Sequence, residues 1–195
     1  SEISLMPEGL AQGLSEQDLV DLLAFLTTLK QPVSIIGRFD ALTLPGDGAN
    51  PTRVDPKAKF DPAATIEDHS GAKHTWHRVE ADAEGRIELA PLVGGTTSEP
   101  VVHLLAPVTS PDAQTARLIL DTNAEVQVWV GGNEVHLSRT GNDGPRTAEV
   151  ALPKGTTNLL VRVWKNLDGA AVVTTLVTDT PLEFSPSEAA KVSAR

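Results

Sequence analysis

The sequence contains no cysteine and no tyrosine, and Met6 is its one methionine. Without cysteine the chain forms no disulfide and has no thiolate nucleophile, and the same lack is compatible with an oxidising or a reducing compartment. Long apolar runs are also missing, since no stretch reaches the roughly 18 apolar residues that indicate a membrane-spanning helix. We therefore expect no membrane span.

Positive charge is scarce. The 195 residues include 16 Lys and Arg against 26 Asp and Glu, which gives a formal net charge of −10. The chain has no cluster of Lys and Arg residues that could follow a phosphate backbone. We therefore do not expect nucleic acid as a partner. The length suits one ordinary domain with some extra chain at its ends.

Sequence motifs of catalysis are absent as well. The chain has no Gly-x-Ser-x-Gly elbow, no phosphate-binding loop and no dinucleotide-binding glycine pattern. Acidic residues are numerous, but no motif frames a pair of them as an acid and a base. We expect a protein that is not an enzyme.

A helix is predicted from Ser15 to about Lys30. Ser15 is a favourable N-cap with Asp18 three residues later, and Pro32 ends the helix. An apolar stripe at helical spacing consists of Leu19, Leu22, Leu23, Leu26 and Leu29. This stripe needs a partner, either another domain or a second copy of the helix, and the second case predicts a homodimer.

The segment before this helix reads Ser4-Leu5-Met6-Pro7-Glu8-Gly9-Leu10. Together with the helix, it resembles the C-terminal end of a class I cytochrome c domain. The resemblance implies that Met6 is an axial haem ligand in a complete parent protein, with haem c as its cofactor. Covalent attachment requires Cys-x-x-Cys-His, so we expect no cofactor in this chain itself. Residues 1–32 are then either the end of a haem domain or a remnant without a haem role.

From residue 33 onward, short apolar alternations are separated by Gly, Pro, Asn and Asp, which is typical of an all-β sandwich. We assign the β domain to residues 33–182 and a tail to residues 183–195, with a long loop from Pro45 to Pro62. Strands are predicted at 33–39, 75–79, 86–89, 101–108, 115–121, 125–130, 134–138, 146–152, 157–165 and 171–177. Gly131 and Gly132 predict a tight hairpin between two of them.

Three segments of this region, 116–121, 126–133 and 152–163, follow one another in an order similar to galactose-binding-domain-like jelly rolls. The resemblance implies a jelly-roll layout for this sandwich. With the helix predicted above, the expected fold is mainly β: a jelly-roll-like antiparallel β-sandwich preceded by the N-terminal amphipathic α-helix. Such modules are common as accessory domains beside glycoside hydrolases. The resemblance is one of fold, and it does not identify a ligand.

Three tryptophans suggest a sugar site, because carbohydrate rings stack on exposed aromatic faces. Strand alternation places Trp129 and Trp164 on one face, with Arg162 beside them for a cation–π contact, and Trp76 is the third tryptophan. The lack of tyrosine weakens this hypothesis. The alternative, which we favour, is that a neighbouring element buries this face.

Metal sites have little support. Asp121, Asn123 and Glu125 could offer oxygen ligands to calcium, as could residues 142–144, but the spacing does not match an EF-hand loop and Asx-rich turns look the same without metal. His69, His74 and His77 lack the spacing of a zinc site, and we expect them to be solvated.

These observations favour a non-catalytic C-terminal fragment of a larger periplasmic or extracellular electron-transfer protein. Its β-sandwich would act as an accessory binding or interaction module, in contact with upstream domains of the same parent. The two alternatives are a carbohydrate-binding module, which implies a glycan partner, and a structural spacer.

Overall fold

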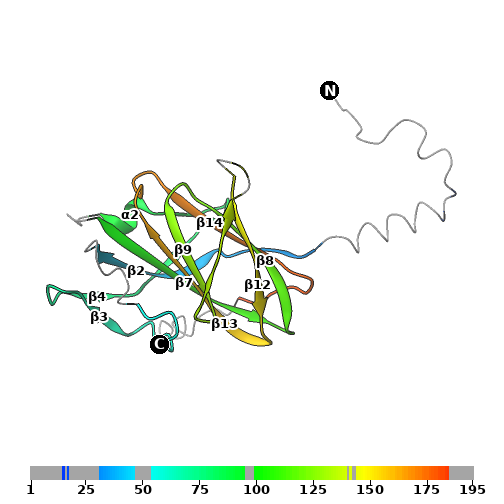
Figure 1. Ribbon diagram of the computed structural model, residues 1–195, viewed down its shortest axis with the longest axis horizontal. Coiled ribbons are helices and arrows are strands. Elements are labelled where there is room, and N and C mark those ends of the chain that lie inside the picture. The colour runs from blue at the N-terminus through cyan, green and yellow to red at the C-terminus, as the bar shows by residue number, and fades with distance from the viewer. Residues whose placement is uncertain are drawn as a thin grey trace, which may run out of the picture. The chain divides into compact units, whose positions relative to one another are not determined.

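The computed structural model describes residues 15, 17, 31–46, 54–94, 99–139, 141 and 144–184 (Figure 1). The chain divides into two compact units, residues 1–31 and 32–195. Met6 and nearly all of the predicted N-terminal helix lie outside the described residues. The second unit is mainly β.

Two six-stranded sheets form this unit, and every strand pair among the described residues is antiparallel. The first sheet contains β1 (Val33–Ile35), β6 (Arg86–Glu88), β8 (Gln114–Asp121), β11 (Ser138–Arg139), β12 (Arg146–Leu152) and β14 (Ala171–Val177). The second contains β2 (Arg38–Pro45), β5 (His77–Glu80), β7 (Pro100–Ser110), β9 (Glu125–Val130), β10 (Asn133–Val135) and β13 (Gly155–Trp164). A hairpin of β3 (Thr65–Glu67) and β4 (Lys73–Thr75) and a short helix, α2 (Ala90–Val93), complete it.

The order of strands is β1-β14-β8-β12-β11 in the first sheet, with β6 also paired to β14. In the second sheet the order is β10-β9-β13-β7-β2-β5. From β7 to β14 the chain passes repeatedly between the sheets, and Figure 1 shows β8, β12 and β14 alternating along the sequence with β7, β9 and β13.

A common hydrophobic core lies between the two sheets. Leu118 and Leu120 of β8 and Val161 and Val163 of β13 are fully buried in it. Because side chains alternate between faces of a strand, the long strands β7, β8 and β13 contribute every second residue to this core. Burial of one such side chain contributes about 1.5–3 kcal/mol, so the shared core holds the sheets together.

The predicted hairpin is confirmed. β9 and β10 pair with Val130 opposite Asn133, and Gly131 and Gly132 have φ angles of 57° and 79°. Glycine adopts these angles without strain, which is why a two-residue turn forms here.

Three of the predicted strands, 125–130, 146–152 and 171–177, match β9, β12 and β14. Three others are wrong in one respect, since each is two strands. The predicted strand 33–39 divides into β1, which pairs with β14, and β2, which pairs with β7 in the other sheet. Likewise 75–79 divides between β4 and β5, and 134–138 between β10 and β11. Apolar alternation continues across these breaks, so the pattern alone does not reveal a change of partner.

The segment after β14 is attached to the fold where it is described. Leu182 is buried, and Glu183 exchanges two backbone hydrogen bonds with Thr109, of 3.0 and 2.9 Å. Glu183, the first residue of the predicted tail, is therefore paired with Thr109 of the second sheet. The rest of it, from residue 185, lies outside the described residues.

Candidate functional site

The outer face of the second sheet carries Trp129. Val128 and Val130 point into the core, so strand alternation turns Trp129 away from it. The indole nevertheless retains only 7% of its exposure. Trp129 belongs to a second hydrophobic cluster, whose other buried members are Leu42, Leu44, Val54, Leu105 and Leu160. Phe60, Ile66 and Trp76 pack against this cluster and help to cover it.

The cover comes from the chain between β2 and β5. Two Asx turns shape it: the Lys57 N–H donates to Asp55 Oδ1 and the Ala63 N–H donates to Asp61 Oδ1, both at 2.9 Å. Phe60 lies edge-on to Trp76, with ring centroids 5.1 Å apart and planes at 87°. This geometry is favourable for an aromatic pair and fixes both rings over the sheet.

An aromatic pocket of about 190 Å³ remains between this cover and the sheet. Aromatic side chains from three separate segments line it, together with aliphatic residues and four polar ones. The aromatic members are Phe60, Trp76 and Trp129, and the polar members are Asp55, Lys59, Asp61 and Asn158. Sites for drug-sized ligands are roughly 300–1,000 Å³, so this pocket suits a single small ring.

Arg162 and Trp164 lie on the same face of the sheet but do not line the aromatic pocket. The Arg162 guanidinium lies 4.9 Å from the Trp164 ring centroid, and its Nη1 donates to Gln127 Oε1 at 3.3 Å. Arg162 is buried and Trp164 is half-buried. The structure thus brings Trp76 and Trp129 together and places the other two candidates at a separate position.

His103 is a residue that sequence reasoning missed. It lies directly opposite Arg162 on β7 and is almost completely buried. Burial, and then the positive charge of Arg162, lower the pKa of His103 from 6.5 to about 3, so the imidazole is neutral. Neither ring nitrogen has a hydrogen-bond partner of good geometry among the described residues, and the Leu42 backbone raises the pKa by less than the two lowering effects. The sequence signal that could have revealed its burial is the position of His103 as a single histidine within the apolar run 101–108.

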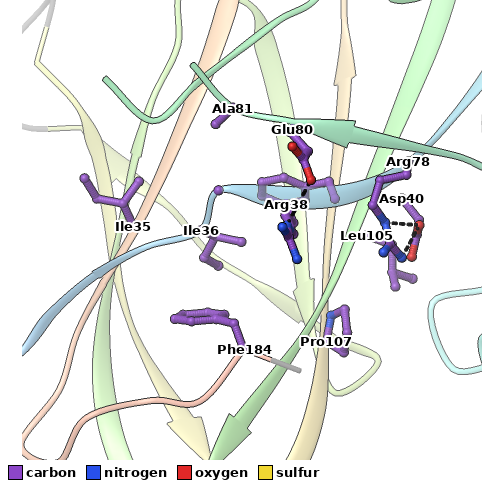
Figure 2. Close-up of a pocket in the computed structure, with 12 residues that line it drawn as sticks. Ile35, Ile36, Arg38, Asp40, Arg78, Glu80, Ala81, Leu105, Pro107 and Phe184 are labelled. Atoms are coloured by element: carbon purple, nitrogen blue, oxygen red, sulfur yellow. Dashed lines mark hydrogen bonds and ion pairs between the residues drawn. The ribbon is translucent and has the colours of Figure 1, made fainter. Parts of the chain in front are cut away.

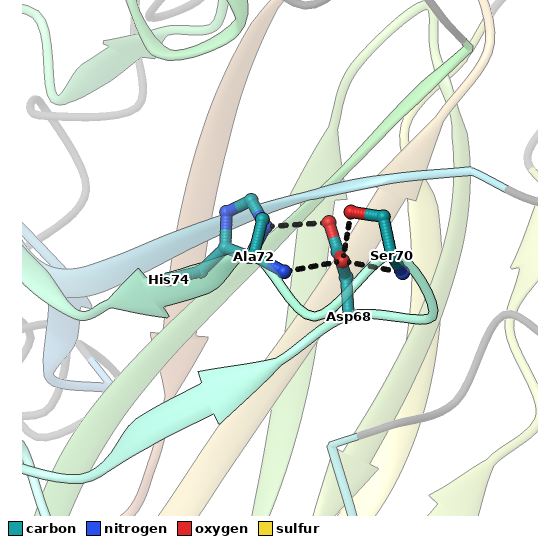
Figure 3. A network of polar contacts seen from close by, with 4 residues as sticks. All are labelled: Asp68, Ser70, Ala72 and His74. Carbon is teal, nitrogen blue, oxygen red and sulfur yellow. Dashed lines mark hydrogen bonds and ion pairs between the residues drawn. The ribbon is translucent and has the colours of Figure 1, made fainter.

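A polar network closes the β3–β4 hairpin (Figure 3). Asp68 Oδ1 accepts from the Ser70 N–H, the Ser70 hydroxyl and the Ala72 N–H, while Oδ2 lies 2.9 Å from His74 Nε2. The Ser70 hydroxyl, and then His74, hold the pKa of Asp68 well below its usual range.

This network is not a catalytic triad. In a triad the histidine bonds to the serine it activates, but here Ser70 and His74 both bond to Asp68. The expectation of solvated histidines holds for the exposed His69 and His77 and is wrong for His74, which is partly buried in this network.

The weak calcium candidates Asp121, Asn123 and Glu125 are exposed. Within the described part of the chain, no group of three or more His, Cys, Asp or Glu side chains is placed to hold a metal ion. Asn142 and Asp143 lie outside that part. No helix among the described residues is long and apolar enough to cross a bilayer.

No protein-family model and no curated protein matches the sequence. Among solved structures, an anti-sigma factor domain-containing protein is similar over 82% of this chain and 49% of its own, at 10% identity and a TM-score of 0.46. A β-glucosidase from Kluyveromyces marxianus is similar over 76% of this chain and 15% of its own, at 11% identity and a TM-score of 0.41. An anti-sigma factor domain-containing protein from Clostridium clariflavum is similar over 80% of this chain and 46% of its own, at 14% identity and a TM-score of 0.37. The chain thus spans about half or less of each.

Proposed function

We propose that the β unit is a non-catalytic sugar-binding accessory module with a jelly-roll-like β-sandwich fold. Support for the fold comes from the two antiparallel sheets around one core and from the passage of successive strands between them. Support for the function comes from the aromatic pocket.

The single observation that carries the proposal is the meeting of Phe60, Trp76 and Trp129 beside Asp61 and Asn158. The C–H face of a sugar ring packs on aromatic faces, and its hydroxyl groups bond to carboxylate and amide groups. A pocket with these two kinds of wall and room for one ring has the chemistry of a sugar site. An aliphatic ligand would leave the polar wall unused.

Calorimetric titration with a panel of neutral saccharides tests this proposal. Trp76→Ala removes an aromatic wall, and we expect it to weaken binding by about tenfold or more, which corresponds to the loss of about 1.4 kcal/mol. Because Trp76 also packs against Phe60, Asn158→Ala serves as a second variant that spares the aromatic cluster.

Trp164→Ala is the matched control, since Trp164 lies on the same face outside the pocket. Binding lost equally in all three variants would contradict the assignment of the site to the aromatic pocket. Absence of binding in the parent chain would leave the spacer hypothesis as the better account.

We further propose that the parent protein is an extracytoplasmic cytochrome c-like electron-transfer protein, with this module as its appendage. The support is the Met6-Pro7 segment and the helix pattern after it, which lie in the sequence outside the described residues. Upstream domains would then bury the apolar stripe of the helix, and a homodimer is the alternative partner.

A chain extended upstream by about a hundred residues, the size of a small domain, and produced with haem-maturation machinery should show a low-spin c-type spectrum. That spectrum should change on Met6→Ala. A colourless product would remove the haem proposal and leave the sugar proposal intact.

A further inference from the structure

A second pocket, of about 370 Å³, shares Leu105 with the aromatic pocket. Figure 2 shows the residues that line it. The start of β2, the end of β5 and the segment around Phe184 form its walls. We call it the charged pocket because Arg38, Asp40, Arg78 and Glu80 line it. Figure 2 shows the Arg38 guanidinium pointing toward the space between Phe184 and Pro107.

Leu105 lines both pockets. It belongs to one row of residues that crosses five strands of the second sheet, each opposite the next in register: Trp129, Leu160, Leu105, Asp40 and Arg78. The first three line the aromatic pocket and the last three line the charged pocket. Neighbouring strands lie about 4.8 Å apart, so the four steps of this row span roughly 19 Å, which exceeds the length of one sugar ring.

Two ion pairs make the charged pocket electrically neutral. Arg38 Nε lies 3.1 Å from Glu80 Oε1, and Arg78 donates through Nε and Nη2 to Asp40 Oδ1 at 3.2 and 3.0 Å. The Arg38 and Glu80 side chains are 60% and 63% exposed, so a ligand can reach their remaining polar atoms. Exposed pairs of this kind contribute only about 0–1 kcal/mol to stability, so they yield readily to new partners.

The charge balance indicates the class of ligand. An anionic ligand would meet two carboxylates in the pocket and a chain of net charge −10 around it. A neutral polyhydroxyl ligand instead finds donors and acceptors side by side, with an apolar wall of Leu105, Pro107 and the 39% exposed Phe184 for its C–H groups.

We propose that the outer face of the second sheet binds a neutral oligosaccharide chain, with one ring in the aromatic pocket and a later ring in the charged pocket. This inference rests on the sugar-binding function proposed above and adds a second subsite to it.

Calorimetry with β-1,4-linked gluco-, xylo- and galacto-oligosaccharides, from the monosaccharide to the tetrasaccharide, tests the subsite. For the series that binds, the affinity should rise by about tenfold or more with chain length. The double variant Arg38→Gln/Glu80→Gln keeps the pocket neutral and should remove this rise without changing the affinity for the monosaccharide. Arg86→Gln/Glu88→Gln, which removes an exposed ion pair on the first sheet, should leave both unchanged.

The outcomes separate the two proposals. Monosaccharide binding that depends on Trp76, without a gain for longer chains or with a gain that survives Arg38→Gln/Glu80→Gln, would overturn the second subsite and leave the sugar function standing. A larger gain with oligogalacturonate than with the neutral chain of equal length would overturn the assigned class. Failure of every saccharide to bind would overturn both.

Discussion

At the residue scale, His103 is the least expected feature of the second sheet. Its imidazole is buried opposite Arg162, and its pKa falls from 6.5 to about 3. The unfolded chain therefore takes up this proton first as the pH falls. His103 leaves the stability independent of pH above about pH 6.5. As the pH falls from 6.5 to 3 the native state loses stability, and the loss reaches on the order of 5 kcal/mol at about pH 3.

Replacement of His103 by Leu should flatten the pH dependence of unfolding between pH 6.5 and 4.5, a window above the range in which the Asp68 carboxylate takes up a proton. One proton taken up on unfolding gives a slope of about 1.4 kcal/mol per pH unit, and the variant should lose most of it. Urea unfolding at several pH values measures the slope. The exposed His77→Gln is the control, and equal slopes in His103→Leu and the parent would contradict the burial account.

The tryptophans show how far residue-level prediction reaches. Alternation along β9 and β13 was enough to place Trp129 and Trp164 on one face, and Arg162 beside Trp164. It was not enough to separate them into a pocket wall and a cation–π pair. That difference depends on the chain from residue 54 to 66, whose Asp, Pro and Lys residues carry no signal of the sheet they cover.

At the scale of elements, Asp68 organises the hairpin that carries Ile66 into the aromatic pocket. Four contacts to its carboxylate hold the turn. Because the pKa of Asp68 is lowered, its contribution to stability is present above about pH 4 and is lost as the pH falls below that value.

Asp68→Asn should lower the urea midpoint and speed hydrogen exchange at the Ser70 and Ala72 amides, since a neutral amide is a weaker acceptor than a carboxylate. Asp82→Asn is a matched control. Asp82 accepts the equivalent two amides, from Glu84 at 3.0 Å and Arg86 at 2.8 Å. Its side chain is exposed, so we expect a smaller effect. Equal effects in the two variants would show that Ser70 and His74 add nothing to the turn.

Element prediction was successful where a strand has one partner sheet and a clear turn beside it, as in β12, β14 and the β9–β10 hairpin. It was wrong where the chain changes sheets within an apolar stretch, as at Ile36, whose N–H donates to the Thr174 carbonyl of the first sheet shortly before β2 joins the second. The three-residue strand β3 was not predicted, because it lies in a Pro- and Asp-rich stretch that is typical of a loop.

At the scale of the whole molecule, the sequence was sufficient to predict a mainly β unit with antiparallel sheets. Neither pocket could be predicted, because each is formed by segments far apart in the chain. The aromatic pocket unites residues from 54 to 160, and the charged pocket unites residues from 35 to 184. Both lie on the outer face of one sheet, which makes this face the functional surface in our account.

The three tryptophans offer the most direct test of that account. Their indole N–H signals can be followed by ¹H–¹⁵N NMR while a neutral oligosaccharide is added. We predict that the signals of Trp76 and Trp129 shift together with one saturation curve while that of Trp164 stays in place. Stationary signals for Trp76 and Trp129 with every saccharide tested, or a shift confined to Trp164, would contradict the assignment of the aromatic pocket as a sugar site.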